Sequence, residues 1–310
     1  MTARSRPLRI GTRGSPLART QTELVCRALA GADPALAAAG AIEVVVVRTT
    51  GDRVVDRPLA ELGGKGLFCK ELEAALLDGQ IDLAVHSMKD LPTWLPDGLV
   101  IGAMLPRADP RDMLIAREQP CAIAELPRGA VVGTTSLRRR AQLLARRPDL
   151  EMVTLRGNLD TRLRKLADGE VAATLLARAG LDRLGLMPPG GLLLELDQML
   201  PAVGQGAVGI ECRAGDPILG LMAAIDHAPT SLCVAAERAM LDVLDGSCHT
   251  PIAGHAWLDH GRMRLRGLVA RPDGAKAHAT EQVAATVEGV RLGREVGQEL
   301  RARAGPHFFD

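Results

Sequence analysis

The chain has 310 residues, of which 47% are hydrophobic and 24% are charged, and its formal net charge is +1. This length and composition indicate a globular protein of two or three domains with a sizeable core. The near-zero charge and an aromatic content of 2% argue against nucleic-acid binding, which needs a basic surface or rings for base stacking.

The N-terminal residues, MTARSRPLRIG, are basic but lack the apolar segment of a secretory signal. No apolar run in the chain reaches the length of a membrane span. We therefore expect a cytoplasmic protein with no membrane part. The six cysteines are scattered without a C-x-x-C pair, which favours reduced thiols over disulfides and predicts no metal site.

The first predicted elements are a strand at residues 8–10 and a helix that runs to about residue 29. Ser15 is suited to the N-cap of this helix and Pro16 to its first turn. Arg13 and Ser15 then lie on a strand-to-helix turn, beside a helix N-terminus that attracts anions. The same pattern also fits an ordinary capped helix with a solvated arginine, so it does not by itself define a binding site.

Residues 41–48, AIEVVVVR, predict a β-branched strand of the buried, parallel kind. The polar, Gly-rich connection at 49–66 that follows is long and irregular, which is typical of a mobile lid beside a site. A helix and a further strand follow, so the element order up to residue 85 predicts a parallel sheet flanked by helices.

The segment 65–93 carries the densest group of reactive side chains. Phe68, Leu72, Ala75 and Leu76 recur at helical spacing, and residues 81–85 then predict a buried strand. Ligands of open α/β sheets bind beyond the carboxyl ends of such strands. At this strand's end stand an imidazole, a hydroxyl, an ammonium and a carboxylate, on His86, Ser87, Lys89 and Asp90. This loop is the predicted centre of the chemistry.

The chain then forms a strand at 99–105 and crosses, at about 108–116, into a second unit. Predicted strands at 130–133, 153–155 and 171–176 are each followed by a helix whose first residues include arginines. The arginines at or beside these helix starts are Arg138, Arg139, Arg156 and Arg162, and Arg183 follows further along the last helix.

Cations at a helix start oppose the helix dipole, so local helix stability does not explain these arginines. Arginine is also the residue suited to bidentate capture of carboxylate or phosphate. We therefore predict that they converge on one crevice that binds an anionic ligand.

Residues 200–210 form a Gly-punctuated apolar segment that predicts a strand returning to the first unit. From residue 229 the pattern changes to a helix at 233–244, strands at 254–258, 263–270 and 278–284, and a helix at 287–303, a small α+β unit. Cys248 lies on the loop before the first of these strands. Its spacing leaves two interpretations open, an inert loop thiol or a functional one.

Nine segments together resemble one family closely, porphobilinogen deaminase, also called hydroxymethylbilane synthase. They follow the family's order across nearly the whole chain. They are GTRGSPLA from Gly11, GGKGLF at 63–68, AVHSMKDLP at 84–92, DPRDMLI at 109–115, VGTTSLRRRAQL at 132–143, RRPDL at 146–150, LRGNLDTRL at 155–163, LPAVGQGAVGIECR at 200–213 and AAERAMLDVLDGSC at 235–248.

The resemblance implies an α/β fold with two lobes like those of periplasmic binding proteins, mainly parallel sheets, and a small α+β C-terminal domain. It places domain 1 at residues 1–105 and 206–226, domain 2 at 106–205 and domain 3 at 227–310. It also implies that Cys248 carries a dipyrromethane cofactor through a thioether. The family's usual Gly-Gly-Cys is Gly246-Ser247-Cys248 here, and we expect the small serine to require only a modest backbone adjustment.

The resemblance further implies the reaction. Porphobilinogen is a pyrrole with an acetate, a propionate and an aminomethyl group, and four units are joined with loss of ammonia before the linear tetrapyrrole is released. Asp90 is implied as the acid that protonates the leaving amine and as the carboxylate that stabilises the resulting cation. The other implied binding residues are Arg13, Ser15, Lys65, Phe68, Ser87, Lys89, Thr134, Ser136, Arg138, Arg139, Arg156, Gly157, Arg162, Arg183 and Gln205. His86 is better interpreted as structural, and the family suggests a monomer.

Two other functions fit parts of the sequence. A two-lobed binding protein that holds an anion without chemistry would explain the arginines, but not the cysteine loop of a third domain. A nucleic-acid role for the arginine-rich segment 138–147 is weakened by the net charge and the few aromatic residues.

Overall fold

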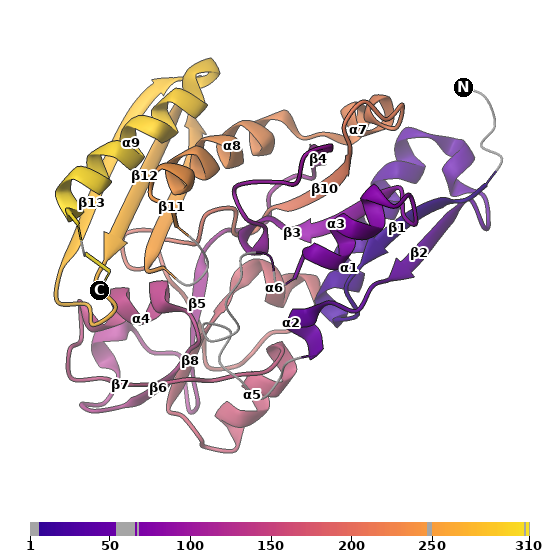
Figure 1. The fold of residues 1–310 in the computed structure, drawn as a ribbon. Helices are drawn as coiled ribbons and strands as arrows, with labels where there is room; N and C mark the ends of the chain where they lie inside the picture. Colours follow the sequence, from indigo (N-terminus) through magenta and orange to yellow (C-terminus); the bar gives the residue numbers. More distant parts are fainter. Residues whose placement is uncertain (1–5, 54–65, 67, 247–249, 307, 310) are drawn as a thin grey trace. The chain divides into compact units, whose positions relative to one another are not determined.

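The computed structural model describes residues 6–53, 66, 68–246, 250–306 and 308–309. The chain divides into two compact units, Met1–Arg107 with Ala207–Ser231, and Ala108–Gly206 with Leu232–Asp310. Figure 1 shows the helices and strands with their labels.

The first unit contains a five-stranded sheet with the order β2-β1-β3-β10-β4. Its strands are β1 (Leu8–Thr12), β2 (Ile42–Val46), β3 (Leu83–Ser87), β4 (Leu99–Met104) and β10 (Val208–Arg213). β1 runs parallel to β2 and β3, whereas β10 is antiparallel to both β3 and β4. The predicted return of the chain to the first unit is therefore confirmed, and the returning strand lies inside the sheet.

Helices cover both faces of this sheet. They are α1 (Pro16–Ala32), α2 (Thr50–Arg53), α3 (Lys70–Leu77) and α7 (Leu219–Ile225), with short 3-10 turns at Pro34–Ala37 and Met88–Asp90. Leu83 and Val85 of β3 belong to the core that also contains residues of α1 and α7, whereas Ala84 packs in the cluster with Leu72 and Leu76 of α3. Because successive strand residues point to opposite faces, α1 and α7 lie on one face and α3 on the other.

The prediction that residues 41–48 form a buried strand is wrong in one respect. β2 is parallel to β1, but Val44 and Val46 are 47% and 40% exposed. The reason is its position, since β2 is the outermost strand of the sheet. Hydrophobic composition alone does not distinguish an edge strand from a central one.

The second unit contains another five-stranded sheet, with the order β7-β6-β8-β5-β9. Its strands are β5 (Asp112–Ala116), β6 (Val131–Gly133), β7 (Glu151–Val153), β8 (Ala173–Ala177) and β9 (Gly191–Leu193), and its helices are α4 (Leu137–Leu144), α5 (Leu159–Ala167) and α6 (Arg178–Arg183), with a 3-10 turn at Ile123–Glu125. β6 is parallel to β7 and β8, and β5 is antiparallel to β8 and β9. The two sheets therefore share one topology, with β10 and β5 in equivalent positions.

This shared topology confirms the predicted pair of α/β lobes with mainly parallel sheets, since four of the five strands in each sheet run in one direction and β10 or β5 runs in the other. In each sheet two strand pairings are parallel and two are antiparallel. The antiparallel pairings all involve β10 or β5, the strands next to the points where the chain passes from one unit to the other.

The C-terminal part of the second unit is an antiparallel sheet with the order β11-β12-β13, covered by two helices. Its elements are α8 (Ala228–Val243), β11 (Ile252–Asp259), β12 (Arg262–Ala270), β13 (Ala277–Ala285), a 3-10 turn at Thr286–Glu288, and α9 (Gly289–Ala304). Met240, Leu265 and Val296 belong to one buried cluster that joins α8, the sheet and α9. This matches the predicted α+β arrangement, while its status as a separate third domain stays a prediction.

Among the described residues no single helix is long and apolar enough to cross a membrane. The helices α7 and α8 meet that criterion only when taken together, and a bend of 103° separates them.

Candidate functional site

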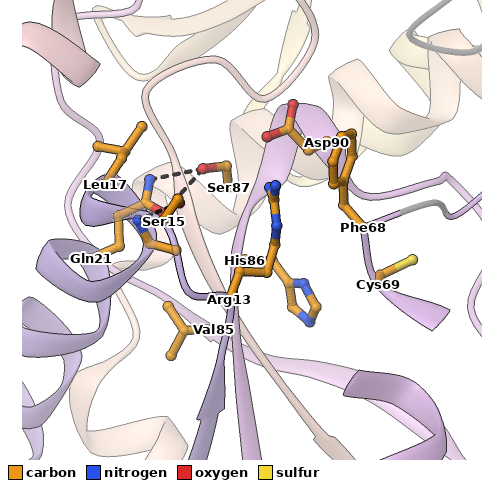
Figure 2. A pocket seen from close by; sticks show the side chains of 11 residues that line it. Arg13, Ser15, Leu17, Gln21, Phe68, Cys69, Val85, His86, Ser87 and Asp90 are labelled. Carbon is orange, nitrogen blue, oxygen red and sulfur yellow. Dashed lines mark hydrogen bonds between the residues drawn. The ribbon is translucent and has the colours of Figure 1, made fainter. Parts of the chain in front are cut away.

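A pocket lies at the carboxyl end of β3 in the first unit (Figure 2). Its lining comes from the β1–α1 turn, from α1, from the residues before α3, and from the end of β3 with its following turn. The lining residues are Arg13, Ser15, Leu17, Ala18, Gln21, Phe68, Cys69, Val85, His86, Ser87 and Asp90. Five residues of the predicted set (Arg13, Ser15, Phe68, Ser87 and Asp90) are thus brought together from three separate segments.

Met88, two residues before Asp90, anchors the turn that carries Asp90. Met88 is 1% exposed, and its backbone N–H donates to the carbonyl oxygen of Ala207 at 3.1 Å. A Cβ at Gly209 would lie 2.1 Å from the Met88 sulfur, so the glycine makes room for this anchor. The 3-10 turn then presents Asp90 on the surface, where no described residue donates a hydrogen bond to its carboxylate.

Arg13 lies over the aromatic ring of Phe68, with its guanidinium carbon 4.0 Å from the ring centroid. Figure 2 shows the guanidinium beside Phe68, on the same side of the pocket as Asp90. A guanidinium over a ring face is held by a cation–π attraction. Here the same contact also sets the direction of the Arg13 side chain. Ser15 caps α1, since its Oγ accepts a hydrogen bond from the Ala18 backbone N–H at 3.3 Å.

Ser87 is held by Gln21, a residue of α1 that is 3% exposed. The Gln21 Nε2 atom lies 2.8 Å from the Ser87 Oγ atom, and the Gln21 Oε1 atom lies 3.1 Å from it. The side-chain amide therefore fixes the position of the hydroxyl at the pocket wall.

His86 is buried and its Nε2 atom lies 2.9 Å from Oε2 of Glu211 on β10. This agrees with the structural role predicted for His86. Glu73, which is also buried, lies in the same region, and burial raises its pKa against the opposing effect of a hydrogen bond with Cys69. Burial also raises the pKa of the Cys69 thiol, so this thiol is protonated and unreactive.

In the second unit, Arg138 and Arg139 converge on one carboxylate of the protein itself. Arg138 Nη1 lies 2.7 Å from Asp112 Oδ2, and Arg139 Nη2 lies 2.8 Å from Asp112 Oδ1. All three side chains are at most 7% exposed. Burial alone would raise the pKa of Asp112, but the two guanidinium charges outweigh that effect and hold it well below its usual range.

This cluster qualifies the inference that an anionic ligand explains both arginines. The anion that they contact is Asp112, so two positive charges and one negative charge are buried together, with a net charge of +1. The Nε atoms of Arg138 and Arg139 are buried without a hydrogen-bond partner among the described residues. Each guanidinium therefore retains a donor group that none of the described residues satisfies.

Gln205 and Arg183 hold the segment through which the chain leaves the second unit. Gln205 is 1% exposed and its Nε2 donates to Asp112 Oδ1 at 2.9 Å and to the Pro110 carbonyl at 2.6 Å. Arg183 Nη2 donates to the carbonyl oxygen of Gly206 at 2.6 Å. Burial lowers the pKa of Arg183.

The remaining predicted residues of the second unit lie on the loops after β6 and β7 and, for Arg162, in the first turn of α5. Ser136 caps α4, and Thr134 Oγ1 accepts a hydrogen bond from the Ser136 backbone N–H at 3.1 Å. Gly157 has a φ of +115°, and Arg162 Nε donates to its carbonyl oxygen at 2.8 Å. Arg156 is half-buried just before it. Because β6, β7 and β8 are parallel, these loops share one edge of the sheet.

Three predicted features fall outside the described residues: Lys65, Cys248 and most of the lid at 49–66. Lys89 is described and half-buried beside Asp90.

Sequence reasoning did not identify Gln21, Asp112 and Glu211 as contributors to the site. Asp112 lies within the DPRDMLI segment, and a carboxylate at the start of an apolar strand was the available signal. Glu211 likewise interrupts the apolar strand β10. Gln21 gives no such signal, because it is one polar residue on an amphipathic helix.

Residues 8–219 match the family described as "Porphobilinogen deaminase, dipyromethane cofactor binding domain", and residues 231–302 match "Porphobilinogen deaminase, C-terminal domain". The chain is 55% identical over 305 residues to "Porphobilinogen deaminase" of Paracoccus denitrificans (strain Pd 1222), which covers 98% of this chain and 96% of that protein. It is 50% identical over 307 residues to "Porphobilinogen deaminase, chloroplastic" of Oryza sativa subsp. japonica. This match covers 98% of this chain and 86% of the rice protein. Among solved structures, the VFT2 domain of Bordetella pertussis BvgS is similar at 15% identity and a TM-score of 0.42, over 76% of this chain and 91% of that one.

Proposed function

Because the chain belongs to the porphobilinogen deaminase family, we propose that it deaminates porphobilinogen and joins four units on a covalent dipyrromethane cofactor, releasing hydroxymethylbilane. The observation that carries the proposal is the exposed carboxylate of Asp90 at the end of β3, in a pocket that also holds Arg13. This pairing supports the proposal, because the substrate has an amine that an acid can protonate and carboxylates that a cation can bind.

The chain's donor groups fit a cofactor that bears several carboxylates. The two buried Nε donors of Arg138 and Arg139 lack partners among the described residues, and carboxylate oxygens are their natural acceptors. We propose that Arg156, Arg162, Arg183 and Lys89 bind further carboxylates, with neutral hydrogen bonds from Thr134, Ser136, Gly157 and Gln205. When bound, the group supplies a pyrrole α-carbon as the nucleophile.

Cys248 is the proposed attachment point. It follows α8 and precedes β11, and Glu237 of α8 ties these elements together. The Glu237 carboxylate accepts hydrogen bonds from the Ala256 N–H at 2.8 Å and from the Gly204 N–H at 2.7 Å. Glu237 therefore ties α8 to β11, the two elements that precede and follow Cys248 in the sequence.

Asp90 has two proposed tasks. As an acid it gives its proton to the amine that leaves the substrate, because expulsion of an unprotonated amine is unfavourable. As the resulting carboxylate it stabilises the positive charge that develops on the substrate pyrrole. The Asp90 carboxylate is suited to both tasks, because it accepts no hydrogen bond from a described residue and its oxygens stay available to the substrate.

Arg13 is proposed to bind a carboxylate of the substrate, Ser15, Ser87 and Phe68 to complete the pocket, and Lys65 to contribute to binding. Gln21 holds the Ser87 hydroxyl in position, as the two contacts described above indicate. The substrate is then oriented by groups that need not rearrange when it binds.

The test is the intact mass of the purified protein combined with turnover of porphobilinogen. We expect a mass above that of the sequence by one dipyrromethane, a colour reaction with acidic aldehyde reagent, and release of hydroxymethylbilane. A Cys248→Ser variant should have the mass of its own sequence. Unmodified wild-type mass, no colour and binding of porphobilinogen without turnover would instead identify a two-lobed binding protein.

Cytoplasmic location, a monomeric state and the absence of nucleic-acid or membrane partners stay predictions. The relatives from Oryza sativa subsp. japonica and Pisum sativum, 50% and 49% identical to this chain, are named chloroplastic.

A further inference from the structure

A glycine on the short helix α2 contacts the ring that supports Arg13. A Cβ placed on Gly51 would lie 2.2 Å from Cε1 and 2.4 Å from Cδ1 of Phe68. Both distances are far below any van der Waals contact, so the ring occupies the space that a side chain at position 51 would need. Gly51 has no positive φ, so backbone conformation does not explain the glycine.

The helix that carries Gly51 is tied to α3. The backbone N–H of Thr50 donates to Glu71 Oε1 at 2.8 Å, and the Thr50 hydroxyl lies 2.5 Å from the same oxygen. Glu71 is only three residues after Phe68 in the sequence. The two Thr50–Glu71 contacts therefore fix the position of α2 relative to the segment that carries Phe68. Gly51 can therefore not retreat easily from the ring.

Phe68 in turn has Arg13 over its ring at 4.0 Å from the centroid. The three residues form a stack that we call the Gly51–Phe68–Arg13 stack. Arginine has many side-chain rotamers, and a ring in a fixed place restricts its guanidinium to a few of them. Figure 2 shows the result, a guanidinium directed into the pocket near Asp90.

We propose that Gly51 and Phe68 are positioning residues, which hold the Arg13 guanidinium where it receives a substrate carboxylate. This inference rests on the proposed function for the identity of the substrate. A methyl group at position 51 would displace the Phe68 ring, since an aromatic side chain moves more easily than two tied helices. Arg13 would then lose its contact with the ring face while Asp90 would remain in place.

The experiment compares Gly51→Ala with wild-type holoenzyme in steady-state kinetics with porphobilinogen. We expect KM to rise about tenfold with kcat nearly unchanged, because the loss is in substrate binding rather than in proton transfer. Gly220→Ala is the matched control: Gly220 also lies in a helix of the first unit, and nothing lies within 4 Å of its added Cβ. Its KM should equal that of the wild type.

Two double variants test whether Gly51 acts on Arg13 through Phe68. In a Phe68→Leu background, and separately in an Arg13→Gln background, adding Gly51→Ala should not raise KM further. Either an unchanged KM in Gly51→Ala alone or a full additional increase in these backgrounds would overturn the proposal.

Denaturant unfolding separates this inference from the proposed function. Gly51→Ala should lower the midpoint in the wild-type background and leave it unchanged in the Phe68→Leu background, whatever the substrate. A protein without porphobilinogen turnover would contradict the proposed function, and this unfolding pattern would still decide whether Gly51 acts on the Phe68 ring.

Discussion

Asp90 and Asp112 are two aspartates with opposite surroundings. Asp90 is exposed on a turn, whereas Asp112 is fully buried between two arginines. A carboxylate that must react with a substrate needs free oxygens, and one that must neutralise buried cations needs none. The two positions therefore call for different experiments, one on turnover and one on stability.

At Asp90 the expected consequence is loss of turnover without loss of fold. Asp90→Asn keeps the size of the side chain but removes its ability to give up a proton, so kcat should fall at least about a hundredfold. The melting temperature should stay close to that of the wild type, because the carboxylate has no hydrogen-bond partner among the described residues. Asp97→Asn, at another exposed position of the same unit, should leave turnover intact. Activity retained in Asp90→Asn would contradict the assignment of the acid.

At Asp112 the expected consequence is loss of stability. Asp112→Asn leaves Arg138 and Arg139 buried without a counter-charge, and removing one partner of such a buried pair typically costs about 3–5 kcal/mol. Denaturant unfolding measures the difference. Asp273→Asn is the control, because Asp273 is 59% exposed where it pairs with Arg271, and such pairs contribute only about 0–1 kcal/mol. Equal effects at the two positions would mean that Asp112 does not neutralise the arginines.

At the scale of elements, the sequence predicted the features that depend on neighbouring residues. Ser15 caps α1 as expected, and the three C-terminal strands lie within a few residues of their predicted bounds. The error depends on residues far apart in the chain, because the exposure of β2 follows from its edge position in the sheet. The reversed strands β10 and β5 likewise depend on where the chain passes between the two units.

The candidate site divides in the same way. The pocket around Asp90 follows from residues at the ends of predicted strands, and these were identifiable. The partner of Arg138 and Arg139 was not, because Asp112 is 26 and 27 residues away and reaches them only through the pairing of β5 with β8. A pattern of arginines predicts an anion, but it does not show whether that anion belongs to a ligand or to the protein.

The contact between α8 and α9 depends on a glycine. A Cβ at Gly293 of α9 would lie 2.1 Å from the Ala236 carbonyl oxygen of α8, which is backbone and cannot rotate away. Gly293→Ala should therefore destabilise the second unit by about 1–3 kcal/mol, although alanine favours a helix. Gly31→Ala in α1, where nothing lies within 4 Å of the added Cβ, should be neutral or stabilising. Thermal unfolding of the two variants checks this, and a stabilised Gly293→Ala would disprove the close packing.

At the scale of the whole molecule, the buried carboxylates predict sensitivity to acid. Arginine partners outweigh burial and lower the pKa of Asp112 and of Asp82, so each contributes stability above the pKa of the unfolded chain, near 4. That contribution is lost as the pH falls through the lower, folded values. Glu73 acts in the opposite sense, because its pKa is raised by burial and its contribution is lost as the pH rises.

We therefore expect the free energy of unfolding to fall as the pH drops from 5 to 3, since the two aspartates outnumber Glu73. Denaturant unfolding at several pH values measures this. In Asp112→Asn the decrease should be smaller, and an unchanged pH dependence in that variant would show that other groups cause the acid sensitivity.

The position of β10 also bears on how the chain folds while it is being synthesised. β5 to β9 are contiguous in sequence between residues 112 and 193, so the second sheet has all its strands as soon as that stretch has left the ribosome. The first sheet begins earlier but stays incomplete, because β4 pairs only with β10, which ends at residue 213. We expect the sheet of the lobe that is translated second to form first. Until β10 has been synthesised, the N-terminal strands cannot complete their sheet, so they should depend most on chaperones.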